Sequence, residues 1–504
     1  MSPATPRDLT PEVADALLAC VTGARWFGGK GRRARLVGVT ALPWLTDLSD
    51  YRSAAAPLAV RTEVAEIAYL AAGPTDRGGQ DAARGDAAED GGRGDQPDSG
   101  PHELYQLSVA YRPVPVPELA AAEIGRWEDR ELGPVVAYDA MRDPQACTLL
   151  LEALLAERRL QGGNAEVGFH LSAGEGLSPE LAPAVFTGQQ SNTSVMFGEV
   201  AMLKLFRRLE LGRNLDIEVH DALSRTSMAD VAQLFGWVEA SWPGTDPTTG
   251  QPATLSADLA MVVEKLSDAT DGWELALAAL QDGQSFAGRA HDLGRALAET
   301  HSALRSAFPT SRLPGAEVTE VMSGRLESAR GVAPALDPYA AGLRSVFAAL
   351  AAHELDIQRV HGDFHLGQTL HTPGGWKIID FEGEPVKTLA ERAAPDSVWR
   401  DIGGMLRSFD YAAASVPGPG SLDWARECRT AFLSGYAGGE LAPTDAAVLR
   451  AYEADKAVYE VVYETRNRPD WVAIPLAAVA GLAGDDSQTR DAAAPPGASN
   501  QGKE

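Results

Sequence analysis

The stretch from Val360 to Pro385 places two carboxylates and an amide at fixed spacing around a short apolar run. Asp363 lies in the sequence His-Gly-Asp-Phe-His, and the amide residue Gln368 follows five positions later. Asp380 comes twelve positions after Gln368 and ends the apolar run. Each half is common when it occurs alone. Both halves in this order indicate two adjacent loops that present oxygen atoms to one site.

Such a group of side chains suits phosphoryl transfer. The spacing has the layout of a kinase catalytic loop, with a base aspartate, a metal-binding amide, and a strand that ends in a second metal-binding aspartate. On this interpretation Asp363 is the catalytic base that orients an acceptor hydroxyl. Gln368 and Asp380 are then predicted to hold Mg²⁺ on a nucleoside triphosphate.

Composition limits the classes of partner. The 504 residues suffice for two to four domains, and 70 acidic residues against 44 basic ones give a net charge of −26. This acidic balance argues against nucleic acid or an anionic membrane as the main partner and favours a neutral or cationic substrate. The 3 cysteines have no metal-ligand spacing. No signal peptide or membrane span is visible, so we expect a cytoplasmic protein without disulfides.

Residues 1–140 are predicted to form a β-rich domain. A helix is expected over 9–22 with Thr10 as its N-cap, and strands are expected over 35–43, 57–71 and 103–112. Between the last two strands, residues 73–100 are mostly Gly, Asp, Ala and Arg. A segment of this composition cannot bury enough apolar area to offset its ordering entropy, so it is predicted to be disordered. It is either a long hairpin loop or a linker between domains.

Residues 141–266 are predicted to form the N-lobe of a kinase. A helix is expected over 143–160, and strands over 230–242 and 259–266. Lys204 lies in an apolar strand, where it either points to solvent or pairs with nucleotide phosphates and a helix carboxylate. Glu218 on the next helix is our choice for that carboxylate, and Asp216 is the competing one. The preceding polar loop lacks a G-x-G-x-x-G pattern but could donate to phosphate oxygens through Ser191, Asn192, Thr193 and Ser194.

Residues 267–484 are predicted to form a mostly helical C-lobe, followed by a disordered tail at 485–504. Helices are expected over 272–282, 286–307, 316–330, 337–354, 421–436 and 443–466, with a further helix starting near residue 396. His301 lies in the second of these helices and is interpreted as a packing residue. Acidic and aromatic residues at helical spacing in the last helix suit a sugar platform, and they suit an ordinary amphipathic face equally well.

The chain resembles the actinobacterial maltokinases, within the aminoglycoside phosphotransferase-like kinase superfamily. The resemblance is carried by His361 to Gln368, by Ile379 to Pro385, and by Asp455-Lys456-Ala457-Val458-Tyr459-Glu460. It covers residues 184–480 strongly and the first 140 residues more loosely, mainly through Arg25-Trp26-Phe27. Closely similar actinobacterial proteins phosphorylate glucosamine at its 6-hydroxyl and share the catalytic motif.

The resemblance implies an α+β, bilobal protein-kinase-like fold with an N-terminal β-rich cap subdomain and a mostly helical C-lobe. It also implies ATP and Mg²⁺ as donor and cofactor, with Lys204 and Glu218 positioning the phosphates. Two positions differ from many maltokinases, Asn467 and the run Trp399 to Ile402. The candidate contacts of the acceptor sugar are His365, Glu382, Asp401, Arg407, Tyr459, Glu460 and Arg468.

Three functional hypotheses follow. The first is an ATP- and Mg²⁺-dependent sugar kinase that makes maltose 1-phosphate, with glucosamine kinase as the alternative. The second is a catalytically inactive kinase-like binding protein, against which the complete set of Asp363, Gln368, Asp380 and Lys204 argues. The third is an aminoglycoside or protein kinase. The expected partners are ATP and a small sugar, with no nucleic acid or membrane, and the chain is expected to be a monomer or homodimer.

Overall fold

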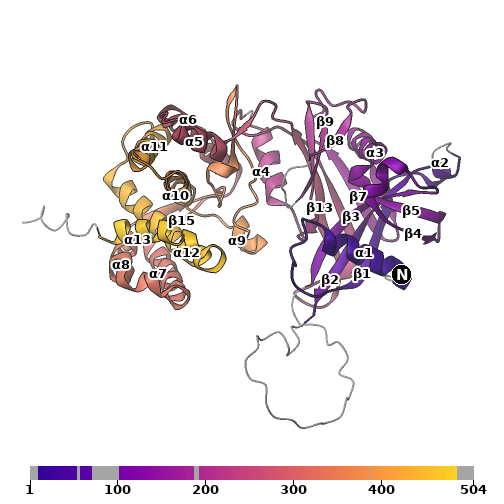
Figure 1. Cartoon of the computed structure of the whole chain (residues 1–504), viewed down its shortest axis with the longest axis horizontal. Helices are drawn as coiled ribbons and strands as arrows, with labels where there is room; N and C mark the ends of the chain where they lie inside the picture. Colours follow the sequence, from indigo (N-terminus) through magenta and orange to yellow (C-terminus); the bar gives the residue numbers. More distant parts are fainter. Residues whose placement is uncertain are drawn as a thin grey trace, which may run out of the picture. The chain divides into compact units, whose positions relative to one another are not determined.

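The chain folds into two structural units. The computed structural model describes residues 9–53, 57–70, 102–186, 192–226, 228–385 and 387–484. The first unit comprises Met1–Asp221 and Gln233–Lys265, and the second comprises Ala222–Ala232 and Leu266–Glu504. Figure 1 shows their elements by colour along the sequence. The predicted insert at 73–100, the predicted tail at 485–504 and Ser191 lie outside the described residues.

The first unit begins with α1 and a six-stranded antiparallel sheet. The sheet order is β1-β2-β3-β5-β4, and the short β11 also pairs with β3. The helix starts as predicted, because Thr10 accepts a hydrogen bond from the Val13 amide at 3.4 Å. The elements of this part are α1 (Pro11–Gly23), β1 (Ala34–Trp44), α2 (Leu48–Ser53), β2 (Ala59–Tyr69), β3 (Glu103–Arg112), β4 (Glu123–Asp129), β5 (Gly133–Asp139) and β11 (Arg208–Leu209).

Apolar residues at helical spacing fix α1 on this sheet. Val13, Leu17 and Val21 lie on one face of the helix and are buried. They share a core with tyrosines of the strands, among them Tyr105 and Tyr111. This core is the reason that the β-rich region folds around α1.

The first unit also holds a seven-stranded antiparallel sheet. Its order is β6-β7-β12-β13-β10-β9-β8. Its elements and the adjoining helices are α3 (Pro144–Leu155), β6 (Arg159–Gly162), β7 (Ala165–Leu171), β8 (Pro183–Val185), β9 (Thr193–Phe197), β10 (Ala201–Leu205), α4 (Leu215–Ser224), β12 (Leu234–Thr245) and β13 (Pro252–Glu264). Lys204 lies in β10, opposite Met261 of β13 and Ser194 of β9.

The helix predicted over 143–160 is shorter than expected. Asp143 caps it by accepting hydrogen bonds from the Gln145 and Ala146 amides, and it ends at Leu155. Glu157 then takes a left-handed backbone conformation with φ of 47°. This turn cannot continue a right-handed helix, so the chain reverses into β6.

The second unit is mostly helical, as predicted. Its helices are α5 (Gly272–Gln281), α6 (Ala287–Ala307), α7 (Gly315–Val332), α8 (Ala340–Ala348), α9 (Leu389–Ala393), α10 (Trp399–Ser415), α11 (Ser421–Ala437), α12 (Pro443–Asn467) and α13 (Ala473–Gly484). Its strands are β14 (Thr270–Asp271), β15 (Ser311–Pro314), β16 (Glu354–Ile357), β17 (Thr369–Thr372) and β18 (Gly375–Ile378). The helix predicted over 337–354 is correct only in part, because 3-10 turns flank α8 and the first of them contains Pro338.

The helix α10 forms the centre of the second unit. It packs against both α11 and α12, and α6 lies beside α11 (Figure 1). The approach of α6 to α11 is close, because a Cβ atom on Gly294 would lie 2.1 Å from the Phe432 carbonyl oxygen. Among the described residues, no helix is both long and apolar enough to cross a bilayer.

Candidate active site

Asp363 lies in a loop between β16 and the 3-10 turn Leu366–Gln368. Two buried apolar side chains, Phe364 and Leu366, anchor the loop on both sides of His365. Gly362 has a φ of +86°, which allows the sharp turn just before Asp363. The loop also lies against α10, because a Cβ atom on Gly404 would come within 2.6 Å of the Phe364 carbonyl oxygen. The catalytic loop is therefore held tightly while Asp363 itself stays 21% exposed.

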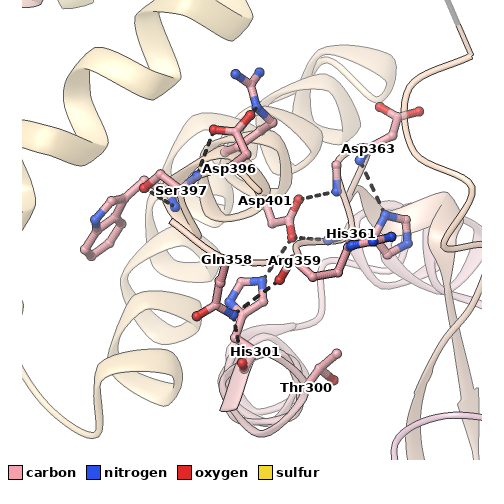
Figure 2. A network of polar contacts seen from close by, with 12 residues as sticks. Thr300, His301, Gln358, Arg359, His361, Asp363, Asp396, Ser397 and Asp401 are labelled. Carbon is pink, nitrogen blue, oxygen red and sulfur yellow. Dashed lines mark hydrogen bonds and ion pairs between the residues drawn. The ribbon is translucent and has the colours of Figure 1, made fainter. Parts of the chain in front are cut away.

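Asp401 binds the backbone of this loop. Its carboxylate accepts hydrogen bonds from the amides of His361 and Gly362, each at 2.8 Å (Figure 2). It also contacts Nε2 of His301 at 2.9 Å, and Nδ1 of His301 lies 2.9 Å from the Tyr436 hydroxyl. Burial alone would raise the pKa of Asp401, but the hydrogen bond and charge of His301 outweigh it and lower that pKa. Asp401 is therefore a fixed anion that holds the turn before Asp363.

Gln368 and Asp380 lie together, as the spacing predicted. The Gln368 amide nitrogen donates to Oδ2 of Asp380 at 3.3 Å, and the Ile379 amide donates to the Gln368 carbonyl at 3.1 Å. Asp380 has a left-handed φ of 67°, which turns the chain directly after β18. A carboxylate and the oxygen of an adjacent amide are a donor set that fits Mg²⁺. Their role as metal ligands stays a prediction.

Side chains of α12 and of the catalytic loop itself set the electrostatic surroundings of Asp363. Nζ of Lys456 on α12 lies 3.3 Å from Oδ1 of Asp363. Burial alone would raise the pKa of Asp363, but Lys456, His365 and His361 together lower it below the usual range. Burial lowers the pKa of His365, and its Nδ1 accepts a hydrogen bond from the Gly367 amide at 3.1 Å. A neutral His365 therefore carries its proton on Nε2.

A cavity of about 680 Å³ opens beside Asp363. This volume lies within the range of small-molecule sites. Four carboxylates and two cations line it, together with tyrosine and tryptophan rings. The lining residues include Trp273, Asp363, His365, Glu384, Tyr411, Lys456, Tyr459, Glu460, Tyr463, Glu464, Arg468 and Trp471. We call this the acceptor cavity.

Four of the predicted acceptor residues line this cavity, namely His365, Tyr459, Glu460 and Arg468. Their contact with a sugar stays a prediction. The expectation for Asp401 is wrong, because its carboxylate is buried and bound to the catalytic loop.

The expectation for Arg407 is also wrong. This side chain is 1% exposed and pairs with Glu460 at 2.9 Å and with Asp410 at 2.7 Å. It supports Glu460 from behind the cavity wall. Glu382 is not among the residues that line the cavity, and its backbone carbonyl accepts a hydrogen bond from Arg392 at 2.8 Å.

Sequence reasoning missed several residues of the cavity wall, above all Lys456, Glu384, Tyr411 and Glu464. The sequence did carry a signal for Lys456 and Glu464. Lys456, Tyr459, Glu460, Tyr463 and Glu464 recur three and four positions apart, so they share one face of α12. The sequence could not show that this face borders the catalytic loop.

In the first unit, Lys204 pairs with a helix carboxylate. Its Nζ lies 3.0 Å from Oδ2 of Asp216, and both side chains are largely buried. Burial alone would raise the pKa of Asp216, but Lys204 and His220 outweigh it and lower that pKa far below the usual range. The helix carboxylate that the structure places next to Lys204 is thus Asp216, the competing choice of the sequence analysis. Asn214 caps the helix by accepting a hydrogen bond from the Asp216 amide at 2.9 Å.

The predicted polar loop differs from expectation at its end. Thr193 and Ser194 lie in β9 and not in a loop, and Ser194 is buried. The Thr193 hydroxyl accepts a hydrogen bond from Nε of Arg207 at 2.8 Å, and the buried Arg207 also pairs with Asp139 at 2.7 Å. Asn192 directly precedes the strand. The phosphate role of these residues stays a prediction.

Two family matches cover much of the chain. Residues 253–462 match the Phosphotransferase enzyme family, and this segment contains the catalytic loop and α12 up to residue 462. Residues 21–143 match the Maltokinase N-terminal cap domain, and this segment contains the strands β1 to β5 of the six-stranded sheet. Along the chain, the match to the cap domain precedes the match to the phosphotransferase family, as the resemblance implied.

Among curated proteins, the chain is similar to two glucosamine kinases. One, from Streptacidiphilus jiangxiensis, is 29% identical over 358 residues, which are 64% of this chain and 78% of that protein. The other, from Mycolicibacterium smegmatis, is 27% identical over 342 residues, which are 60% of this chain and 80% of that protein.

Solved structures of glucosamine kinases share the fold. One, in complex with glucosamine, ADP and inorganic phosphate, gives a TM-score of 0.59 at 21% identity and covers 94% of this chain and 100% of its own. A second glucosamine kinase structure gives a TM-score of 0.55 at 24% identity and covers 76% of this chain and 91% of its own. The chain therefore carries one segment that matches the Phosphotransferase enzyme family and, before it, one that matches the Maltokinase N-terminal cap domain, and it shares its fold with glucosamine kinases.

Proposed function

We propose that this enzyme transfers the γ-phosphoryl group of ATP to a hydroxyl of glucosamine. The observation that carries the proposal is the charge of the acceptor cavity, which is lined by four carboxylates, Asp363 among them, and by two cations. A sugar that bears an ammonium group gains charge attraction in such a site, whereas a neutral sugar gains only hydrogen bonds from its hydroxyls. The relatives named glucosamine kinase support the same acceptor.

The aromatic rings of the cavity suit the apolar face of a sugar ring. Tyr411 and Trp471 lie nearly parallel, at an interplanar angle of 18° and with centroids 6.4 Å apart. The Arg468 guanidinium lies 4.9 Å from the Trp471 ring centroid and is fixed by Glu464 at 2.6 Å. Rings held in this way can bind a sugar while the carboxylates bind its polar groups.

The chemistry of the transfer depends on positioning and charge. Asp363 orients the acceptor hydroxyl and accepts its proton as the new O–P bond forms and the bond to the ADP oxygen breaks. Asp401 keeps Asp363 in place through the loop backbone. Gln368 and Asp380 would hold Mg²⁺, which neutralises phosphate charge when it is bound. Lys204 would contact the α- and β-phosphates.

Maltose is the second candidate acceptor and the first one that the resemblance suggested. The match of residues 21–143 to the maltokinase cap domain favours it. The cavity of about 680 Å³ has room for a disaccharide as well as a monosaccharide. Volume therefore does not separate the two acceptors.

The test is a kinase assay with four acceptors in parallel. Glucosamine, N-acetylglucosamine, glucose and maltose are compared by kcat/KM with Mg²⁺ and ATP, and the phosphorylated position is identified by ³¹P and ¹H NMR. N-acetylglucosamine is the matched control because it keeps the nitrogen and loses the positive charge. The proposal expects glucosamine to exceed both neutral monosaccharides by about 100-fold, the order that one buried charge contact supplies. A preference for maltose would replace it with the second candidate, and no transfer to any acceptor would contradict both.

A further inference from the structure

Lys456 reaches from α12 to the catalytic aspartate. Its Nζ lies 3.3 Å from Oδ1 of Asp363, and the two side chains are 23% and 21% exposed. The pair therefore lies in the wall of the acceptor cavity, with limited access to water. A charge pair at such a position acts more strongly than one on the surface.

The helix α12 has other attachments that hold it in place. Asp455, the neighbour of Lys456, accepts a hydrogen bond from Arg325 at 2.7 Å. Glu460, one turn later, is bound by Arg407 at 2.9 Å. These contacts fix the turn that carries Lys456, so the ion pair with Asp363 is not what holds the helix. Lys456 is presented to Asp363 by a turn that is already fixed.

Lys456 is surrounded by negative groups. Burial alone would lower its pKa, but Asp363, Glu384 and Glu460 outweigh it and raise that pKa. The ammonium group also lies 5.1 Å from the Tyr459 ring centroid, which favours a cation. Lys456 is therefore charged at any pH at which the enzyme works.

The contact occupies one oxygen of the base. Among the described residues, Lys456 is the donor of the hydrogen bond that the Asp363 side chain accepts. The accepting atom is Oδ1. Oδ2 is the atom left for an acceptor hydroxyl. With one oxygen fixed by a cation, the carboxylate plane is fixed as well.

We propose that Lys456 is a positioning residue of the phosphoryl transfer, which holds Oδ1 of Asp363 so that Oδ2 meets the acceptor hydroxyl. This inference rests on the proposed function. Its positive charge also offsets the repulsion between the Asp363 carboxylate and the anionic phosphoryl group that approaches the same hydroxyl. The hydroxyl proton moves to Oδ2, the sugar oxygen bonds to the γ-phosphorus, and ADP leaves with the electrons of the broken bond.

The test compares Lys456→Met with Lys456→Arg. The first removes the charge and keeps the length of the side chain, and the second keeps the charge. Arg466→Met is the matched control, because Arg466 is an exposed cation on the same helix. For each variant we measure kcat, the KM for ATP and for the acceptor, the pH profile of kcat, and the melting temperature. The carboxyl group of Asp363 is titrated in parallel by NMR with ¹³C-labelled aspartate, which needs no substrate.

Lys456→Met is expected to lower kcat by about 100-fold while the KM for ATP stays within about 3-fold. The acid limb of the kcat profile and the Asp363 titration should both move up by about one pH unit, because a favourable charge next to the carboxylate is lost. His361, His365, Glu384 and Glu460, which also face this site, are unchanged in the variant. Lys456→Arg should recover part of kcat and most of the pH shift.

Two outcomes would overturn the inference. One is a Lys456→Met enzyme with the kcat and acid limb of the wild type. The other is an equal loss in both variants with a lowered melting temperature, which would show a merely structural role. Failure of the proposed function is distinguishable, because the wild-type enzyme would then fail to phosphorylate glucosamine while the Asp363 titration still reports on Lys456.

Discussion

His301 and Asp401, which are 100 residues apart in the sequence, lie in contact through Nε2 and Oδ2 at 2.9 Å. The same carboxylate accepts the amide hydrogens of His361 and Gly362, so one buried anion joins α6, α10 and the catalytic loop (Figure 2). Because the geometry of the base depends on this anion, stability and catalysis should be lost together when it is changed.

Asp401→Asn should lower both the free energy of unfolding and kcat. The amide can accept fewer of the three hydrogen bonds and turns a donor toward donors, which leaves buried N–H groups unpaired. We expect a loss of about 3 kcal/mol in urea unfolding and of about 100-fold in kcat. Asp423→Asn is the control, since Asp423 lies on α11 with its side chain 76% exposed. A variant at position 401 that keeps wild-type kcat would show that the loop does not need this anion.

The same residue predicts an acid-dependent part of the stability. The pKa of Asp401 is lowered in the folded protein, because His301 outweighs the effect of burial. Its contribution is therefore complete above the ordinary carboxyl pKa of about 4 and is lost as the pH falls through the lower folded value. Urea unfolding of the wild type and of Asp401→Asn at several pH values between 7 and 3 should show their difference shrinking below about pH 4. A difference that stays constant over this range would contradict the lowered pKa.

Asp363→Asn should remove the base and leave the fold intact. Asp363 is partly exposed, and its side chain contacts Lys456 rather than the protein core. Loss of a general base costs about 100- to 10,000-fold in rate, so we expect kcat near the detection limit. Calorimetry should show Mg²⁺-dependent ATP binding close to that of the wild type. Turnover near wild type would exclude Asp363 as the base, and an absence of ATP binding in the wild type would favour the inactive binding protein.

The motif from Val360 to Pro385 could be predicted because its chemistry is local. Gln368 and Asp380 are joined by backbone and side-chain hydrogen bonds of adjoining segments, so their spacing alone brings them together. Asp401 was misassigned for the opposite reason. A charged residue in the first turn of a helix is predicted to be exposed unless the loop that covers it is known. In this chain that loop lies 39 residues away in the sequence. Lys456 was missed because its distance of 93 residues from Asp363 carries no pattern.

The choice between Asp216 and Glu218 shows a similar limit. Both acids lie in the first turn of α4, and their spacing to Lys204 differs by only two residues. Asn214 caps the start of the helix through the Asp216 and Ile217 amides, and Asp216 is the acid that meets Lys204 of β10. Helix boundaries are less certain from sequence than the presence of a helix, so this detail needed the structure.

Lys204→Met should impair the use of ATP more than the use of the acceptor. The change removes the cation that would contact the phosphates and leaves Asp216 buried without it. We expect the KM for ATP to rise about 10-fold or more, with a smaller effect on the KM for the sugar. Asp216→Asn should share this effect, and Arg159→Met, an exposed change on β6, should not. An equal rise in both KM values would argue against a phosphate role for Lys204.

Glu384→Gln should weaken the preference for an amino sugar. Glu384 is 8% exposed in the wall of the acceptor cavity, and burial would raise its pKa, but Lys456 and Lys387 lower it, so the side chain is an anion at neutral pH. The glutamine keeps the shape and removes the charge. If the cavity recognises an ammonium group, kcat/KM for glucosamine should fall by about 10-fold, while that for glucose changes by less than about 2-fold. Glu427→Gln on α11 serves as the control for removal of a carboxylate outside the cavity. A parallel fall for both sugars would show that Glu384 acts on the transfer step through Lys456 and not on the choice of acceptor.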